Sequence, residues 1–367
     1  MVSEYPIWKV TLNATAQFSS YILLSYLFVL IFNSMLNEPY KLLSIQYLRG
    51  LAALGVVFCH FGFALTNYPV ISSVFNLGQI GVPVFFFISG FIIAYSLEKN
   101  GYKTSHFFTF LIKRSIRIDP PYWVVIALYI LLGFTLNHLS AYRGVVFRYD
   151  FAQFIAHIFY AVPFTRYSFY NHIFWTLCVE FQFYLLIGLL YFLFKSKAYK
   201  VIFLLAFGVI NLFHFGGDAL ILNYTSIFAL GISFMVFYNN RTLHNIVLPI
   251  IFITLILYRH GFATAAVLLI SSVAVIFVNF RLNALYFLGN ISYSLYLTHF
   301  LVFEICNGIF KRMGIIHLQF LCFSMELVVA ILFAWLFYIF FERPAIRLSK
   351  SFIYLRRPKL DVKSTAA

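Results

Sequence analysis

The sequence predicts an all-α, polytopic membrane protein, a bundle of ten transmembrane helices with an additional hydrophobic helix at the N-terminus. Three observations support this fold class. The 367-residue chain is 63% hydrophobic and only 10% charged, whereas a soluble protein needs more charge to cover its surface. Apolar runs of about 17 to 25 residues recur along the chain, the length that crosses ~30 Å of hydrocarbon. These runs are continuous rather than alternating, which favours helices over a β-barrel.

The apolar runs place the ten helices in order along the chain. We expect spans at residues 43–65, 79–97, 121–137, 173–194, 201–215, 219–237, 246–258, 263–280, 286–309 and 319–341. The seventh span, 246–258, is short for a membrane helix, so we expect it to be tilted or broken. The longest connection on the outer side, 138–172, has the length of a functional loop.

Composition divides the chain into three segments. Residues 1–37 form a hydrophobic extension, residues 38–348 the ten-helix domain and residues 349–367 a basic cytoplasmic tail. The stretch 17–34 has neither the basic n-region nor the small-residue cleavage site of a signal peptide. Two interpretations of the extension stay open. It is either an eleventh helix without a catalytic role, which we favour, or a segment upstream of a true start at Met35.

The net charge of +15 is distributed as in a membrane protein rather than as in a nucleic-acid-binding protein. If residues 38–42 face the cytoplasm, nineteen lysines and arginines fall on the cytoplasmic side and six on the outer side. This excess follows the positive-inside rule for short loops. It predicts that both ends of the ten-helix domain are cytoplasmic, and we expect no nucleic-acid partner.

The four cysteines lie inside apolar segments and lack the spacing of metal ligands. Cys59, Cys178, Cys306 and Cys322 contain no CxxC pair, so each is interpreted as a small buried hydrophobic residue. We therefore expect neither a disulfide nor a metal site.

Ionisable side chains inside a bilayer are costly, so each one in this chain requires a reason. His60 lies eleven residues after Arg49, which is just over three helical turns. Both side chains therefore project from one helix face, ~16 Å apart along the axis. That geometry suits an anion anchor at the mouth of a cleft and a general base within it. A packing histidine bonded to a neighbouring helix is the alternative.

Three further charged residues could support this chemistry. Glu180 is expected at a depth similar to that of His60, which allows a carboxylate to orient the imidazole and to stabilise its protonated form. The structural alternative is a hydrogen bond from Glu180 to a tyrosine or to Gln182. Arg114 and Arg117 share a helix face, so their guanidinium groups can converge on phosphates. Spacing alone favours ordinary cytoplasmic charge for this pair.

Six motifs occur in order between residues 40 and 348. They read Arg49-Gly-Leu-Ala with His60, Gly81-Val-Pro-Val-Phe-Phe-Phe-Ile-Ser89-Gly90-Phe, Arg114-x-x-Arg117-Ile-x-Pro120-x-Tyr122, Trp175-Thr-Leu-Cys-Val-Glu180-Phe-Gln182-Phe-Tyr184, Ile291-Ser292-Tyr293-Ser-Leu-Tyr296-Leu-x-His299 and Glu342-Arg343-Pro344. In these motifs the chain resembles membrane acyltransferase family 3, the bacterial group that O-acylates cell-surface and secreted glycans. Each motif alone is weak, but six of them in this order are specific.

The resemblance implies an enzyme of the bacterial cytoplasmic membrane. It would transfer an acyl group, usually acetyl, from cytoplasmic acyl-CoA to an extracytoplasmic glycan such as O-antigen or exopolysaccharide. Acyl-CoA would be the donor substrate, and no cofactor would be tightly bound. The family's second carboxylate is absent here, because Phe181 follows Glu180, which puts a paired acid in doubt. No esterase-like domain is appended, as in the stand-alone form of the family.

The resemblance also implies roles for individual residues. His60 and Arg49 would be the catalytic pair, with Glu180 in the same active site. Residues that would bind the donor are Arg114, Arg117 and Tyr122, and those that would bind substrate are Ser89, Trp175, Gln182, Tyr293 and His299. Helix packing explains Tyr293 and His299 equally well, and a close helix contact explains Ser89. Glu342 is interpreted as structural, paired with a nearby arginine.

Two chemical routes and two other functions stay open. His60 would remove a proton from a sugar hydroxyl for attack on the thioester, or it would carry the acyl group itself as an acyl-imidazole. A membrane transporter of a small anion or glycan precursor is the main alternative, because intramembrane charged residues also mark transport pathways. Such a protein predicts inverted repeats, and no clear internal symmetry occurs in the sequence. A structural partner of a glycan-export complex is the third interpretation.

Overall fold

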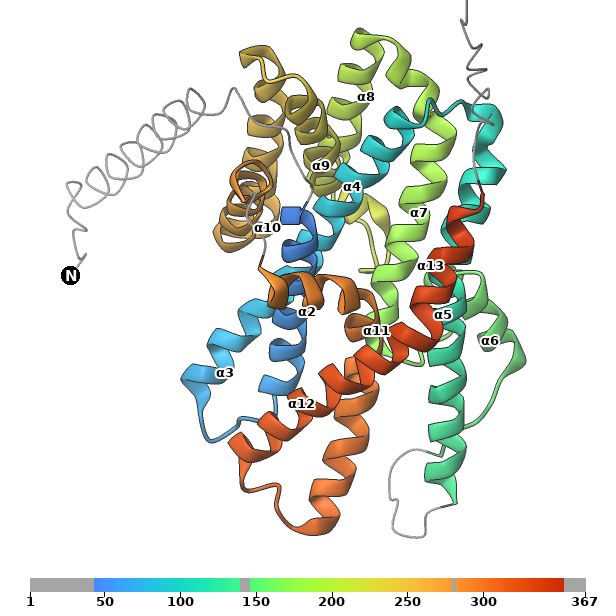
Figure 1. Ribbon diagram of the computed structural model, residues 1–367, viewed down its shortest axis with the longest axis vertical. Coiled ribbons are helices and arrows are strands. Elements are labelled where there is room, and N and C mark those ends of the chain that lie inside the picture. The colour runs from blue at the N-terminus through green and yellow to red at the C-terminus, as the bar shows by residue number, and fades with distance from the viewer. Residues whose placement is uncertain (1–42, 139–145, 279–281, 353–367) are drawn as a thin grey trace, which may run out of the picture. The chain divides into compact units, whose positions relative to one another are not determined.

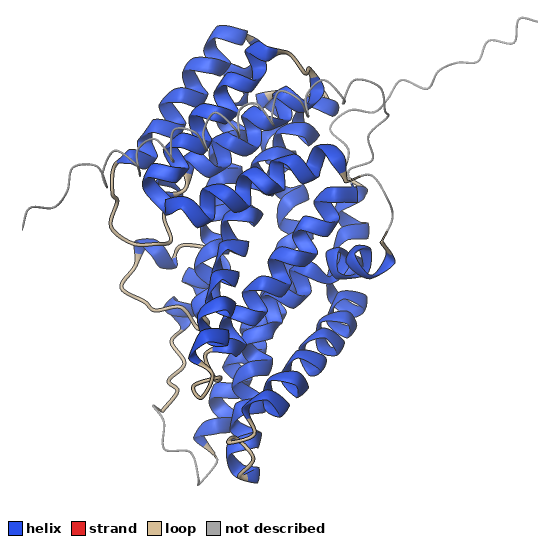
Figure 2. Ribbon diagram, turned by 90° about the vertical axis from the view of Figure 1, so that its left-hand side faces the viewer, coloured by secondary structure: helices blue, strands red, loops and turns tan. Residues whose placement is uncertain are grey.

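The computed structural model describes residues 43–138, 146–278 and 282–352. Within these ranges the protein consists of helices joined by turns and loops, without a strand (Figure 1, Figure 2). The predicted all-α class is therefore confirmed for this part of the chain. The predicted helix at 17–34 and the end of the basic tail lie outside the described residues.

The long helices follow the predicted spans. They are α2 (Leu43–Gly62), α4 (Gly81–Lys99), α5 (Phe107–Asn137), α7 (Trp175–Leu190), α8 (Lys197–Val209), α9 (Thr225–Asn239), α10 (Leu243–Phe277), α11 (Asn283–Met313) and α12 (Gln319–Phe337). Shorter helices are α3 (Pro69–Asn76), α6 (Phe151–Ile158) and α13 (Arg343–Lys350), and a π turn at Tyr338–Glu342 joins α12 to α13. α5 begins at Phe107 rather than at 121, so the basic segment before the predicted span is helical too.

Six helical stretches in the described ranges are long and apolar enough to cross a membrane. They are Leu43–Gly62, Pro69–Lys99, Thr104–Asn137, His172–Lys195, Leu243–Phe277 and Gln319–Lys350. The predicted count of ten spans is therefore not confirmed. α8 and α9 contain 13 and 15 residues, which is about 20 Å and 23 Å of helix. Both lengths fall short of the ~30 Å hydrocarbon layer.

α10 contains the predicted span 246–258 and residues 263–277 of the predicted span 263–280, separated at one residue. Gly261 has φ 84° and ψ 172°, a conformation that is essentially restricted to glycine. The helix is interrupted there, between the two apolar runs. The span 246–258, which was expected to be tilted or broken, is helical throughout, and the interruption lies after its predicted end.

Glycines allow the helices around the site to approach one another closely. A Cβ on Gly50 of α2 would lie 2.8 Å from the backbone nitrogen of Gly289 on α11. A Cβ on Gly90 of α4 would lie 2.4 Å from the carbonyl oxygen of Phe228 on α9. Small residues serve this purpose where lipid leaves no hydrophobic drive between helices. The α2–α11 and α4–α9 contacts are the most extensive in the described part of the chain.

Replacing Gly90 with alanine is expected to destabilise the protein, because the added methyl group would press on the Phe228 carbonyl. Overpacking of this kind costs about 1–3 kcal/mol. Thermal unfolding of the purified protein in detergent would show the loss as a lower midpoint. Gly308→Ala on α11 is the matched control, since nothing lies within 4 Å of a Cβ at that position and alanine favours a helix. Equal midpoints for the two variants would contradict the close packing of α4 on α9.

The long predicted loop carries α6 and packs against α5. His157 is fully buried, and its Nδ1 donates to the Gln153 carbonyl at 2.8 Å while its Nε2 accepts from the Tyr170 amide at 3.0 Å. Burial lowers the pKa of His157, so the ring stays neutral at neutral pH, as these two bonds require. The Tyr160 hydroxyl donates to Asp119 Oδ1 on α5 at 2.8 Å. The loop thereby holds the middle of α5 in place.

Candidate active site

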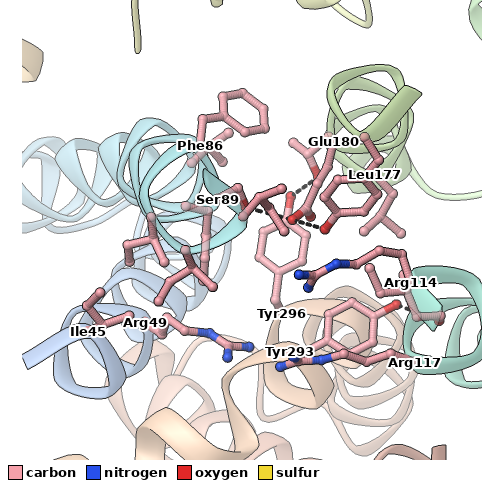
Figure 3. Close-up of a pocket in the computed structure, with 18 of the residues that line it drawn as sticks. Ile45, Arg49, Phe86, Ser89, Arg114, Arg117, Leu177, Glu180, Tyr293 and Tyr296 are labelled. Carbon is pink, nitrogen blue, oxygen red and sulfur yellow. Dashed lines mark hydrogen bonds between the residues drawn. The ribbon is translucent and has the colours of Figure 1, made fainter. Parts of the chain in front are cut away.

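A cavity of about 320 Å³ lies among α2, α4, α5, α7 and α11 (Figure 3). Its walls combine isoleucine, phenylalanine and tyrosine with charged side chains. The lining residues are Ile45, Gln46, Arg49, Val82, Phe85, Phe86, Ile88, Ser89, Ile92, Ile93, Arg114, Arg117, Ile118, Thr176, Leu177, Glu180, Tyr184, Tyr293, Tyr296 and Glu342. Charged groups inside a membrane helix bundle are expensive and mark functional sites.

Three guanidinium groups converge on this cavity. Arg49 comes from α2, and Arg114 and Arg117 come from successive turns of α5. Figure 3 shows the three side chains directed toward the same space. Arg114 Cζ lies 5.7 Å from the centroid of the Tyr184 ring, a cation–π contact that restricts its direction. Because a guanidinium matches phosphate oxygens with two parallel hydrogen bonds, this end of the cavity is suited to an anion.

Glu342 brings a negative charge to the same end of the cavity. It is buried at the junction of the π turn and α13. One of its oxygens, Oε2, accepts from the Ser294 amide at 3.1 Å and from the Ser294 hydroxyl at 2.6 Å. Its charge interacts with Arg49 and Arg117. Pairing with an arginine was expected from the sequence, but its place in the cavity wall was not.

Glu180 is held between α4 and α7. Its Oε1 accepts from Ser89 Oγ at 2.6 Å and from the Tyr184 hydroxyl (Figure 3). Tyr184 lies one turn further along α7, the spacing at which helical side chains meet. Glu180 also interacts electrostatically with Arg49. Ser89 and Glu180, both predicted site residues, therefore lie in one hydrogen-bonded group on the cavity wall.

Tyr296 of α11 and Thr176 of α7 also line the cavity. The Tyr296 and Thr176 hydroxyls are hydrogen-bonded to each other at 2.7 Å, and both also lie within hydrogen-bond distance of the Ile173 carbonyl oxygen, at 3.4 Å and 2.9 Å. The ring of Phe85 lies edge-on against Tyr296, with the two centroids 5.5 Å apart. Tyr293, one turn before Tyr296 on α11, donates to the Ile118 carbonyl at 2.9 Å.

His60 and His299 form a hydrogen-bonded pair next to Tyr296. His60 Nδ1 lies 2.8 Å from His299 Nε2, and the two rings stack with centroids 5.0 Å apart and planes 20° apart. His299 is fully buried, whereas His60 is partly exposed. The Tyr296 ring lies 5.9 Å from the His299 ring and lines the cavity, which neither histidine does. Tyr296 therefore lies between the cavity and the pair.

The expectation that Glu180 orients His60 is wrong, because each of the two side chains has another partner. α2 presents His60 to α11, and α7 presents Glu180 to α4. Equal depth in the bundle allowed the contact, but depth does not specify the direction in which a side chain points around its helix axis. The catalytic roles of His60, Arg49 and Glu180 stay predictions.

Tyr122 was expected to bind the donor, yet it lies in the apolar core. It is fully buried and stacks on Tyr160 with ring centroids 5.2 Å apart, and Phe174 packs edge-on against it at 5.0 Å. Tyr122 follows Arg117 by five residues, which turns it by about 140° around α5. It therefore faces away from the cavity that Arg117 lines.

Trp175 and Gln182 also lie outside the cavity wall. The Trp175 ring stacks on Tyr224 with centroids 5.5 Å apart. Both ends of the Gln182 amide are occupied, because Nε2 donates to the Ala219 carbonyl at 2.8 Å and Oε1 accepts from the Ile221 amide at 3.0 Å. Gln182 thus anchors the loop before α9, which is a structural role.

Thr176 and Tyr184 of α7 line the cavity and were not predicted to belong to the site. With Glu180 they form a line of polar side chains at four-residue intervals along α7. Residues four apart share a helix face, so a polar stripe on an otherwise apolar helix was the signal that could have identified both. Only the glutamate was singled out, because the cost of burying a charge exceeds that of burying a hydroxyl.

The side chains at the site can bind an anion and transfer a proton. Three guanidinium groups supply the first property, and the histidine pair supplies the second. The described ranges contain no group of three or more histidine, cysteine, aspartate and glutamate residues placed to hold a metal ion. All four cysteines are buried, as predicted.

Comparisons with known proteins agree with this chemistry. A family model described as "Acyltransferase domain" matches residues 42–339. A protein of Acidianus two-tailed virus named "Putative acetyltransferase" is 28% identical over 305 residues, which is 74% of this chain and 86% of the viral protein. No solved structure matches the chain. The matched region contains the arginines, Glu180 and both histidines of the site, and the chain belongs to the membrane acyltransferase family 3.

Proposed function

We propose that this protein is a membrane O-acyltransferase that moves an acyl group, acetyl in the simplest case, from cytoplasmic acyl-CoA to a hydroxyl of an extracytoplasmic glycan. The arrangement along α2 carries the proposal. Arg49 lines a cavity with two further arginines. Three turns further along α2, His60 is hydrogen-bonded to His299 of α11. Arg49, which would bind the anion, and His60, which would transfer the proton, are thus ~16 Å apart along one helix.

Acyl-CoA is the donor that the cavity suits. Two oxygens of a phosphate group can accept the two parallel hydrogen bonds that one guanidinium group donates. Arg49, Arg114 and Arg117 face only two carboxylates, Glu180 and Glu342, so the cavity carries one positive charge in excess. A volume of about 320 Å³ accommodates part of such a donor, and its narrow pantetheine arm would extend along the apolar wall.

The transfer step needs a base for the acceptor hydroxyl. His60 Nε2 takes the hydroxyl proton while the hydroxyl oxygen attacks the thioester carbon. The new C–O bond forms, the C–S bond breaks, and the proton passes from His60 to the departing thiolate to give the CoA thiol. In the second route His60 Nε2 attacks the thioester carbon, the C–N bond forms, the C–S bond breaks and CoA leaves as its thiolate. The hydroxyl oxygen then attacks the acyl carbon, the C–N bond breaks, and the hydroxyl proton passes to the thiolate to give the CoA thiol. In both routes the acyl group must pass Tyr296, which lies between the cavity and the histidine pair.

The distribution of charge supports an orientation for this reaction. The cytoplasmic excess of lysine and arginine includes Arg49, Arg114 and Arg117, in line with the positive-inside rule. Their end of the cavity would face the cytoplasm, where acyl-CoA is made, and His60 would lie toward the outer side. We therefore place the protein in the bacterial cytoplasmic membrane with both ends of the ten-helix domain inside.

Two measurements test the proposal. Membranes that contain the protein are expected to release CoA continuously from acetyl-CoA only when a glycan acceptor is present. Mass spectrometry of surface glycans from cells with and without the gene is expected to show a mass gain of one acetyl group. Uptake or export of an anion without CoA release would instead favour the transporter, and glycans identical in both cells would remove the glycan as acceptor.

A further inference from the structure

The hydrogen bonds of His299 determine where its ring proton lies. His299 Nδ1 is 2.6 Å from the Tyr296 carbonyl oxygen and 3.2 Å from the Leu295 carbonyl oxygen. A carbonyl oxygen can only accept, so Nδ1 carries the hydrogen. In a neutral imidazole the other nitrogen, Nε2, then bears the lone pair and can only accept. Complete burial of His299 opposes the doubly protonated, charged ring.

This assignment determines the proton on His60 as well. His60 Nδ1 lies 2.8 Å from His299 Nε2, and since that atom accepts, His60 Nδ1 is the donor. The hydrogen of a neutral His60 is therefore on Nδ1, and its Nε2 bears the lone pair. His60 is partly exposed whereas His299 is fully buried, so His60 is the ring of the pair that a substrate can approach.

We propose that His299 is a positioning residue that holds His60 in the tautomer with a free lone pair on Nε2. The inference rests on the proposed function, in which His60 Nε2 takes the acceptor proton. When it does so, the Nδ1 hydrogen still donates to His299, and the positive charge formed on His60 keeps a hydrogen-bond partner in a medium of low dielectric constant. The stacked rings also restrict rotation of His60, with planes 20° apart.

A second histidine is well suited to this task inside a membrane. A carboxylate would hold the same tautomer, but it would place a negative charge in the hydrocarbon layer, where ionised groups are costly. His299 accepts the hydrogen bond as a neutral ring because two backbone carbonyls of its own helix bind its other nitrogen. The proton arrangement of both rings is thus set by the backbone of α11.

Two substitutions of His299 separate positioning from packing. A glutamine side chain offers an oxygen to His60 Nδ1 and an NH2 group to the Tyr296 carbonyl, whereas leucine offers neither. We expect His299→Leu to lower the acyl-transfer rate roughly 100-fold and His299→Gln to lower it less than about 10-fold. Phe300→Leu is the matched packing control, since the Phe300 ring contacts both histidines, with centroids 5.5 Å and 6.4 Å away. That variant is expected to retain its activity.

A spectroscopic measurement tests the tautomer without turnover. Solid-state nitrogen NMR of histidine-labelled protein in lipid distinguishes protonated from unprotonated ring nitrogens, and loss of the signal in His60→Asn identifies His60. We expect an unprotonated Nε2 on His60 in the unaltered protein and in His299→Gln, and a mixture of tautomers in His299→Leu. An unprotonated Nδ1 in the unaltered protein, or full activity of His299→Leu, would overturn the role of His299. Absence of any acyl transfer with the expected tautomer present would instead count against the proposed function.

Discussion

Replacing His60 with alanine is expected to abolish acyl transfer while the protein still accumulates in the membrane. The substitution removes the imidazole that would take the acceptor proton, and loss of a positioned base lowers a rate roughly 100- to 10,000-fold. The His60 ring is partly exposed at one end of α2, so its loss leaves the main helix contacts in place. CoA release from acetyl-CoA by isolated membranes, divided by the amount of protein on an immunoblot, measures the effect.

A histidine outside the site provides the control for this experiment. His244 is exposed near the start of α10 and does not line the cavity, so His244→Ala is expected to keep full activity. Normal CoA release by His60→Ala would remove the base from the proposed mechanism. The family membership and the helical fold would stand in that case, because neither depends on the role of His60.

Changing Arg114 and Arg117 together to glutamine is expected to weaken acyl-CoA binding with a smaller effect on the rate at saturating donor. Both guanidinium groups line the cavity, and each charge-assisted contact with a phosphate contributes about 1.5–3 kcal/mol. Loss of two such contacts is expected to raise the Kd for acetyl-CoA by roughly 100-fold or more. Calorimetric titration of the purified protein with acetyl-CoA measures this change.

The matched control for the arginine pair is Arg148→Gln. Arg148 is exposed on the loop before α6. Its replacement by glutamine therefore removes one positive charge without altering the cavity. Its affinity for acetyl-CoA is expected to equal that of the unaltered protein. If the double variant bound acetyl-CoA as tightly as this control, Arg114 and Arg117 would serve membrane topology alone.

The helical segments could be predicted from the sequence because burial in lipid requires long apolar runs. The break at Gly261 lies between two such runs, so the predicted spans 246–258 and 263–280 meet at it. The number of membrane crossings could not be read in the same way. Apolar runs at 201–215 and 219–237 fold as α8 and α9, whose helical lengths are too short for a crossing.

The residues of the site were easier to identify than their partners. Arg49, Arg114 and Arg117 were selected from motifs and from the cost of intramembrane charge, and they do line one cavity. The partner of His60 is 239 positions away on α11, and no local pattern connects the two. Helical depth restricted the choice of partner for His60, but rotation of each helix about its axis decided it, and that rotation depends on packing of the whole bundle.

The hydrogen bond between Thr176 and Tyr296 has a consequence for the cell as well as for the reaction. An enzyme that passes acyl groups across a bilayer would dissipate the proton gradient if a continuous water column ran through it. Here Tyr296, hydrogen-bonded to Thr176 and packed against the Phe85 ring, separates the arginine-lined cavity from the histidines. In the proposed reaction these contacts would separate each time an acyl group moves from the cavity to His60, and between turnovers they would oppose the leak of protons.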